Sequence, residues 1–296
     1  MTRTLGVIVL AAGQGTRMKS ALPKVLHRVC GVPMAGHILA AARELEPHRI
    51  AVVVGHGSDQ VRTALAGEGI TFVEQTELLG TADAVRRCRE AMAGCDDVMV
   101  LNGDSPLIRP ELLRELRDAR SVSDPFAFVT CHVDDPGRLG RVLRDGNGLV
   151  ERIVEAADYE GPAGPAEVNA GQYVFDAARL WAGIVQVPKS AKGEYYLTDM
   201  VAIAVSGWTP PATIETDAAE ALGVDDRVKL AEAERIMRGR ILERHMLAGV
   251  TIIDPATTYI DAAVQLETDV TVLPNSSLWG TATVATGCVI GPGTTL

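Results

Sequence analysis

The C-terminal part of the chain carries an aliphatic residue at every sixth position, and small residues, polar residues and glycines fill the gaps. A period of six predicts a left-handed parallel β-helix, in which each face of a triangular coil turns one aliphatic side chain inward. About two coils are present, whereas solenoids need about three units and a cap, so we expect a fragment or a chain that depends on neighbouring subunits. Residues 250–296 are therefore assigned to the start of a β-helix, with these residues in register: Ile260, Leu266, Val272, Leu278, Val284, Ile290 and Leu296.

Before this repeat, apolar runs rich in β-branched residues alternate with segments of helical periodicity. Such alternation predicts an α/β fold of the Rossmann-like kind, with a mostly parallel sheet covered on both faces. Ligands of these sheets bind beyond the carboxyl ends of the strands. We expect strands at residues 5–10, 50–54, 98–101 and 126–129, and helices at residues 33–45, 59–66, 81–93 and 110–120.

Two later segments depart from this alternation. Residues 134–198 contain a hairpin pattern with the turn "DGNG" and a glycine- and proline-rich loop, "YEGPAGPAEV". They predict a small α+β lid over the open edge of the sheet. Residues 226–249 repeat apolar positions at spacings of three and four, which predicts a plain linking helix between a first domain, residues 1–225, and the β-helix.

Composition excludes several classes of protein. The net charge is −10, from 38 acidic and 28 basic residues, which disfavours a sequence-independent nucleic-acid binder but leaves room for a local cationic pocket. The five cysteines contain no C-x-x-C pair, so we expect neither a zinc site nor a disulfide framework. Neither a secretory signal nor an apolar run of membrane-spanning length is evident, so we expect a cytoplasmic protein without a membrane partner.

The stretch "LAAGQGTRMKSALPK" follows the first expected strand. Gly13 and Gly15 let the backbone approach a ligand, while Arg17 and Lys24 offer cations to phosphate oxygens. The spacing matches neither G-x-x-x-x-G-K-[ST] nor G-x-G-x-x-G. A glycine-rich turn alone is the plainer interpretation, but the cations and the preceding strand favour a phosphate cradle.

That stretch resembles the signature L-x-x-G-x-G-T-R-M…P-K of sugar-1-phosphate nucleotidylyltransferases. Further stretches follow in the family's order: "EQTELLGTADAV", "NGDSPLI", "DDPGRLGRV", "IVEAAD", "EVNAG" and "GEYYLTD". Together with the hexapeptide tail, they are similar to the bacterial N-acetylglucosamine-1-phosphate uridylyltransferases, which are usually fused to a glucosamine-1-phosphate acetyltransferase. The resemblance covers essentially the whole chain.

The resemblance implies a Mg²⁺-dependent, in-line transfer of UMP from UTP to N-acetylglucosamine 1-phosphate, which yields UDP-N-acetylglucosamine, a cell-wall precursor, and pyrophosphate. It assigns catalysis to Arg17, Lys24 and Asp104, and the metal to Asp104 and Asp225, where the family has Asn at the second position. The implied nucleotide-binding residues are Leu10, Ala11, Ala12, Gly13, Gln75, Gly80 and Thr81. The implied sugar-binding residues are Asn102, Gly103, Gly140, Glu155, Asn169, Tyr196 and Thr198.

Two departures from the family pattern affect single site positions but not the implied reaction class. Gln14 stands where Lys is common, and Asn102 replaces the aromatic or small residue often found before "GD". Another sugar 1-phosphate or nucleotide, such as glucose 1-phosphate or dTTP, remains a candidate substrate because specificity depends on lid residues that are placed only by the resemblance. A non-catalytic regulatory role is the alternative from another class, although the presence of Arg17, Lys24 and Asp104 together speaks against it. The resemblance also suggests a homotrimer through the β-helix, and the few coils present lead us to expect no acetyltransferase activity in this chain.

Overall fold

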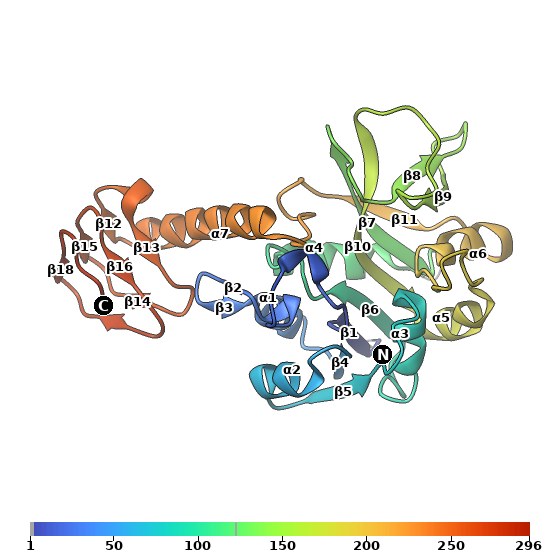
Figure 1. Cartoon of the computed structure of the whole chain (residues 1–296), viewed down its shortest axis with the longest axis horizontal. Coiled ribbons are helices and arrows are strands. Elements are labelled where there is room, and N and C mark those ends of the chain that lie inside the picture. The colour runs from blue at the N-terminus through green and yellow to red at the C-terminus, as the bar shows by residue number, and fades with distance from the viewer. Residues whose placement is uncertain (1–2, 122) are drawn as a thin grey trace.

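The computed structural model describes residues 3–121 and 123–296, which form two lobes joined by a long helix (Figure 1). The N-terminal lobe, residues 3–225, holds a central sheet with helices on both sides, and the C-terminal lobe is the β-helix. Helix α7, Arg227–Leu247, runs between them. Within the described residues, no helix is both long and apolar enough to cross a membrane.

The central sheet has nine strands, of which seven follow the order β11-β7-β10-β6-β1-β4-β5. β1 is parallel to β4 and β6, β4 to β5, and β11 to β7, so the predicted mostly parallel sheet is confirmed. The prediction missed β5 and β11. The strands of this path are β1 Leu5–Leu10, β4 Arg49–Val54, β5 Ile70–Glu74, β6 Asp97–Asn102, β7 Phe126–Val133, β10 Ala166–Asp176 and β11 Ala212–Glu215.

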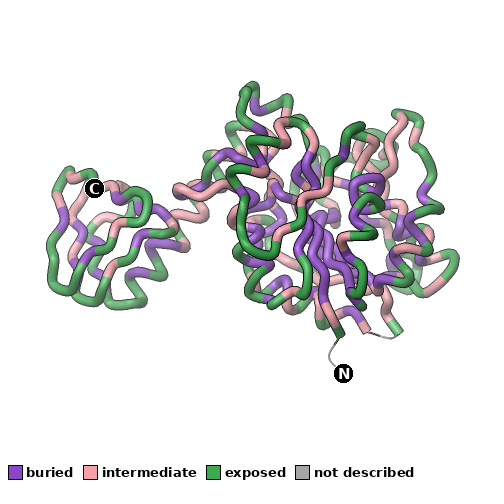
Figure 2. The backbone as a smooth tube through the Cα atoms, turned by 90° about the horizontal axis from the view of Figure 1, so that it is seen from below, coloured by how far each residue is buried: buried purple, intermediate pink, exposed green. Residues whose placement is uncertain are grey.

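Both faces of this sheet are buried, as Figure 2 shows for the central strands. Along β1, Val7 and Val9 pack with α1, α2 and α4, whereas Ile8 packs on the opposite face with α3, α5 and α6. This alternation explains the uninterrupted apolar run, because a strand covered on both faces has no solvent side. The helices are α1 Met34–Arg43, α2 Ser58–Leu65, α3 Thr81–Arg87, α4 Pro110–Ala119, α5 Ala177–Gly183 and α6 Asp199–Gly207, and 3-10 turns cover Thr16–Met18, Lys24–Leu26, Ile184–Gln186 and Pro255–Thr257.

Helix α3 is shorter than the predicted 81–93. The backbone N–H of Cys88 bonds to the carbonyl of Val85, three residues back, at 2.9 Å. A hydrogen bond that spans three residues, instead of four, tightens the last turn of the helix into a 3-10 turn. Irregular turns follow it.

The predicted lid, residues 134–198, is wrong in its second half. Residues 166–176 form β10, which lies inside the sheet between β7 and β6 and is antiparallel to both. The predicted loop 159–168 therefore ends where this strand begins, at Ala166. What projects from the seven-strand path is the hairpin of β8, Arg141–Arg144, and β9, Val150–Val154, the remaining two strands of the sheet, and β8 pairs with β10. Its turn is stabilised as expected, because Asp145 Oδ1 accepts from the N–H groups of Asn147 and Leu149, both at 2.9 Å.

The C-terminal lobe confirms the predicted parallel β-helix. Strands of this lobe pair in parallel with the strands one coil later. In this register Ile260 lies opposite Leu278, and Val272 lies opposite Ile290. Six of the seven hexapeptide positions lie in the core that this lobe shares with α7, and Leu296 is exposed. The strands are β12 Thr251–Ile252, β13 Tyr259–Ile260, β14 Gln265–Leu266, β15 Thr271–Val272, β16 Ser277–Leu278, β17 Thr283–Val284 and β18 Val289–Ile290.

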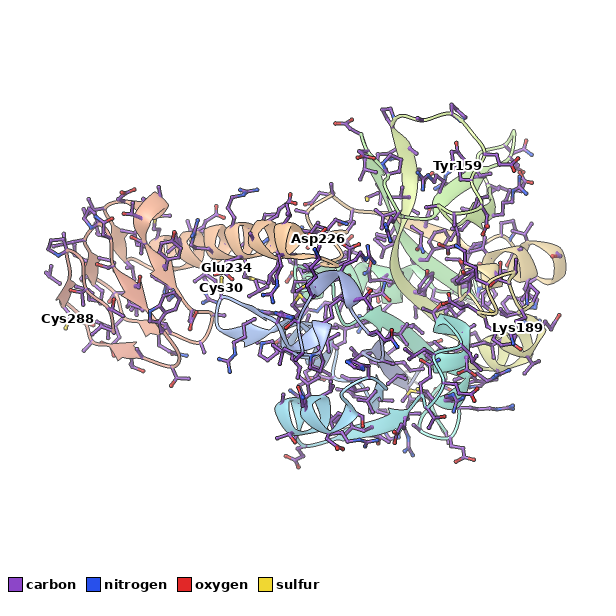
Figure 3. All side chains as sticks on the ribbon, viewed as in Figure 1. Cys30, Tyr159, Lys189, Asp226, Glu234 and Cys288 are labelled. Carbon is purple, nitrogen blue, oxygen red and sulfur yellow. The ribbon has the colours of Figure 1, made fainter. Side chains whose placement is uncertain are left out.

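A hairpin from the N-terminal lobe ties the two lobes together. It consists of β2, Arg28–Val29, and β3, Val32–Pro33, with Cys30 at its tip beside Glu234 of α7 (Figure 3). The N–H of Cys30 donates to the Glu234 carboxylate at 2.6 Å, and its carbonyl accepts from the N–H of Ala262 in the β-helix at 2.9 Å. Gly31 has φ +82°, and a Cβ there would collide with the Asp261 carboxylate, so this contact requires glycine.

The five cysteines are free thiols, of which four are buried and Cys288 is exposed. Burial raises the pKa of the Cys88 thiol to about 12, so this sulfur stays protonated and inert.

A buried ion pair at the start of β6 carries a stability prediction. Asp97 Oδ1 lies 2.6 Å from Arg120 Nε, and both side chains are less than one-tenth exposed. The Asp97→Ala substitution leaves Arg120 buried without its partner and should lower the free energy of unfolding by about 3–5 kcal/mol, measured by urea denaturation. The matched control is Asp118→Ala, which removes an exposed ion pair with Arg117 and should cost less than about 1 kcal/mol. Equal losses of unfolding free energy in the two variants would contradict the stabilising role of the buried Asp97–Arg120 pair.

Candidate active site

Two adjoining cavities open at the carboxyl end of the sheet. The first has a volume of about 390 Å³ and lies over the ends of β1 and β6, beside the start of α3. The second, about 500 Å³, extends from there beneath the β8–β9 hairpin to the start of α7. Both are lined by Leu10, Lys24, Thr81, Asn102 and Asp104.

Most of the predicted nucleotide-binding residues line the first cavity. Ala11 is the exception: it is buried against the core, and its N–H bonds to the carbonyl of Val53 at 2.9 Å. Its part is therefore to hold the end of β1. The residues that do line the cavity are Leu10, Ala12, Gly13, Gln75, Gly80 and Thr81.

The glycine-rich loop is built around its cations. Gly13 faces open space, since nothing lies within 4 Å of the position of a Cβ there. Gly15 has φ +60°, and a Cβ would overlap the side chain of Lys24, so glycine lets the loop fold onto that lysine. Short 3-10 turns follow the glycines in place of the long helix that a dinucleotide-binding loop would start.

The cations and carboxylates of the site contact each other directly. The ammonium of Lys24 pairs with Asp104, and the guanidinium of Arg17 pairs with Asp225. These residues come from the glycine-rich loop, the end of β6 and the segment before α7, which are far apart in sequence. The cations of the predicted phosphate cradle thus contact the carboxylates that the resemblance assigns to the metal. A bound triphosphate would therefore replace the carboxylates as the partner of Lys24 and Arg17, whose side chains are already held at the cavity.

The two predicted metal-binding carboxylates suit a hard divalent cation. The N–H of Val224 donates to the Asp104 carbonyl at 2.8 Å, which brings the segment carrying Asp225 to the end of β6. Asp225 Oδ1 is buried and makes no hydrogen bond within the described residues, although Lys229 Nζ lies 3.3 Å away. In those same parts of the chain, no group of three or more His, Cys, Asp or Glu side chains is arranged to hold a metal ion. Two carboxylates, with water and phosphate completing the shell, fit the way Mg²⁺ binds.

The second cavity gathers most of the predicted sugar-binding residues. Gly103 does not line it. The Gly103 N–H bonds to the carbonyl of Leu10 at 2.9 Å, and a Cβ would lie 2.8 Å from that oxygen, so this glycine permits the close approach of β1 and β6. The residues that line the cavity are Asn102, Gly140, Glu155, Asn169, Tyr196 and Thr198.

Hydrogen bonds fix the polar groups of this cavity. The Thr198 hydroxyl donates to Glu155 Oε1 at 2.7 Å, which leaves the other carboxylate oxygen free to accept. Asn169 Nδ2 donates to the Tyr173 hydroxyl at 2.6 Å, and its Oδ1 accepts from the Gly171 N–H at 3.0 Å. These contacts set the amide of Asn169 so that one N–H remains for a ligand.

Four functional candidates escaped the sequence interpretation. Lys229 lines the second cavity and pairs with Asp225, so α7 is more than the plain linking helix predicted. Asp226 accepts from the N–H groups of residues 228 and 229 at 2.9 Å and so fixes the first turn that carries Lys229. The spacing of four between Asp225 and Lys229 was an available signal. Glu194 in the first cavity and Arg138 in the second gave none.

A glycine-rich loop whose two cations meet two carboxylates at the end of a mostly parallel sheet fits a nucleotidyltransferase domain. Residues 7–202 match the family model of the MobA-like NTP transferase domain, and the chain belongs to that family. The chain is also similar to curated relatives that carry a further name, bifunctional protein GlmU, as the motifs predicted.

The GlmU relative from Streptomyces avermitilis is 43% identical over 303 residues, covering 99% of this chain and 63% of the relative. That from Shouchella clausii is 44% identical over 292 residues, covering 97% and 64%. The chain thus spans less than two thirds of the length of these curated relatives.

Solved structures share the fold at low identity. A Bacillus anthracis structure described as that of a glucose-1-phosphate thymidylyltransferase, with sucrose bound, has a TM-score of 0.65 at 22% identity, covering 79% of this chain and 95% of the other. HddC from Yersinia pseudotuberculosis has a TM-score of 0.59 at 18% identity, covering 78% and 99%.

Proposed function

We propose that this chain transfers UMP from UTP to N-acetylglucosamine 1-phosphate, forming UDP-N-acetylglucosamine and releasing pyrophosphate. The observation that carries the proposal is the presence of two ion pairs, Lys24–Asp104 and Arg17–Asp225, at a cavity lined by residues predicted to bind the nucleotide and the sugar. The similarity to GlmU relatives supports the choice of substrates.

The reaction is an in-line displacement. An oxygen of the sugar phosphate attacks the α-phosphorus of UTP, and the bond to the bridging oxygen of pyrophosphate breaks on the opposite side. Since the attacking phosphate is already ionised, no general base is needed. Arg17, Lys24 and the N–H groups of the glycine-rich loop position the phosphates and neutralise charge that develops between them. Asp104 and Asp225 would hold Mg²⁺, which when bound neutralises phosphate oxygens.

The sugar is proposed to lie in the second cavity. The free oxygen of Glu155 can accept from a sugar hydroxyl, and the remaining N–H of Asn169 can donate to an acceptor such as the acetyl oxygen. Tyr196 and Thr198 belong to a segment that lines the second cavity next to Glu155 and Asn169.

Pyrophosphate release measured across four nucleoside triphosphates and several sugar 1-phosphates, with and without Mg²⁺, tests the proposal. We expect turnover with UTP and N-acetylglucosamine 1-phosphate in the presence of Mg²⁺. Faster turnover with dTTP or glucose 1-phosphate would reassign the substrate, and nucleotide binding without turnover by any pair would favour a regulatory role.

The Thr198→Val substitution should weaken binding of the sugar phosphate. It removes the hydrogen bond that holds Glu155 and should raise the KM for the sugar phosphate about five- to tenfold, with the KM for UTP unchanged. Thr209→Val is the matched control, because its hydroxyl bonds to the Ser123 carbonyl at 3.1 Å outside both cavities. A shift in the KM for UTP alone would contradict the placement of the sugar.

Three further properties are proposed for the natural setting. The product would serve cell-wall synthesis in the cytoplasm, three chains would associate through the β-helix, and acetyl transfer would be absent from this chain. Light scattering of the purified protein and an acetyl-CoA turnover assay test the last two: a monomer, or any acetyl transfer, would refute them.

A further inference from the structure

The side chain of Gln75 is held in one orientation at the edge of the first cavity. It follows β5, lines that cavity and is 4% exposed. Its amide nitrogen, Nε2, donates to the carbonyl of Gly80 and to Oδ2 of Asp83, both at 3.0 Å. Both hydrogens of the amide therefore point away from the cavity, towards the start of α3.

Asp83 is itself fixed by two arginines. Arg86 Nη2 lies 2.7 Å from Asp83 Oδ1, and Arg87 Nε lies 2.8 Å from Oδ2, while the Asp83 side chain is 2% exposed. Burial acts to raise the pKa of Asp83, but hydrogen bonds from Arg87, Gln75 and Arg86 hold it below its ordinary value. The carboxylate is thus ionised and can only accept hydrogen bonds.

These contacts decide which end of the Gln75 amide faces the cavity. A carbonyl and an ionised carboxylate both accept, so the amide must turn its nitrogen to them; the reverse orientation would set oxygen against two acceptors. The carbonyl oxygen of Gln75 makes no hydrogen bond within the parts of the chain that the structure describes. It is the group left to meet a ligand.

We infer that Asp83 is a positioning residue for base selection, because it locks Gln75 with its carbonyl oxygen towards the nucleotide. An acceptor at this place matches a base with an imino N–H, such as N3–H of uracil or thymine, and opposes the N3 acceptor of cytosine. The inference rests on the proposed function, since it concerns the nucleotide of that reaction. It adds a residue that contacts Gln75 from behind and does not line either cavity.

The test compares kcat/KM for UTP, CTP and 3-methyl-UTP, which lacks the imino hydrogen, in the wild type, Asp83→Ala and Gln75→Ala. The wild type should prefer UTP over both others by at least about tenfold, which is the worth of one well-made hydrogen bond to a buried group. Asp83→Ala should reduce that preference by about tenfold through the KM for UTP, with kcat within about threefold of wild type. Gln75→Ala should abolish it.

Further variants separate positioning from folding. Asp83→Asn keeps the volume of the side chain but offers one carbonyl oxygen to three donors, so it should fold and still lose about threefold in preference. Glu90→Ala is the matched control, an exposed acid in the turns after α3 that should change nothing. An unchanged preference for UTP over CTP in folded Asp83 variants would overturn the inference.

Failure of the proposed function would look different. If the wild type releases no pyrophosphate from UTP, the function fails, and calorimetric binding of UTP and CTP to the same variants still tests the role of Asp83. Equal binding of the two nucleotides by the wild type would then overturn the inference as well.

Discussion

Replacing Asp104 with alanine should lower the rate of pyrophosphate release by about a thousandfold while the fold stays intact. The substitution removes one of two carboxylates proposed for Mg²⁺ and leaves the Lys24 ammonium without its partner. The backbone contact of Asp104 with Val224 survives, because it uses the carbonyl of residue 104. Steady-state rates at saturating UTP, sugar phosphate and Mg²⁺, beside a thermal melt, measure both effects.

Two variants sharpen this result. Asp104→Asn keeps the shape but loses the charge, so most of the loss should remain. Asp118→Ala, the exposed acid on α4 used above, should retain full activity. A rate for Asp104→Ala within about tenfold of wild type, with the protein folded, would remove Asp104 from the proposed chemistry.

Lys24→Met should reduce kcat/KM by about a hundred- to a thousandfold. Methionine retains an apolar stem that can pack beside Gly15, where the lysine side chain lies, but it cannot neutralise a phosphate. Because Lys24 and Asp104 touch, their effects should not add: the double variant should be little slower than Asp104→Ala. Steady-state rates of pyrophosphate release at UTP concentrations below the KM provide kcat/KM for each variant.

A matched substitution on another lysine checks specificity. Lys192→Met removes a positive charge from the loop before "EYYLTD". Since Lys192 lines neither cavity, kcat/KM should stay within about threefold of wild type. Additive losses in the Lys24 and Asp104 double variant would show that the two residues act independently.

Local patterns predicted the parts of the fold that depend on short stretches. The run of residues 5–10 is apolar throughout because β1 is covered on both faces, and the hexapeptide spacing follows from stacking one side chain per face. By contrast, β10 sits beside β6 through pairing across residues distant in sequence, and no local pattern reports such a partner. The local pattern of residues 134–198, with its hairpin and loop, therefore predicts a lid and gives no sign of β10.

The site shows the same division. The glycine-rich loop and "NGD" are local motifs, and the cavity lies at the carboxyl ends of the strands, where ligands of a mostly parallel sheet are predicted to bind. The ion pairs of Lys24 and Arg17, by contrast, join segments 80 and 208 residues apart. The orientation of the Gln75 amide depends on Asp83, whose role is visible only once α3 is placed against β5.

The hairpin tip at Cys30 has a mechanical consequence. If the chain segment leading into α7 were the sole connection between the lobes, the β-helix could rotate about the axis of that helix. The bonds from Cys30 to Glu234 and Ala262 add a second attachment away from that axis. Rotation of the β-helix relative to the N-terminal lobe would therefore have to break these hydrogen bonds or move the hairpin and α1 with it.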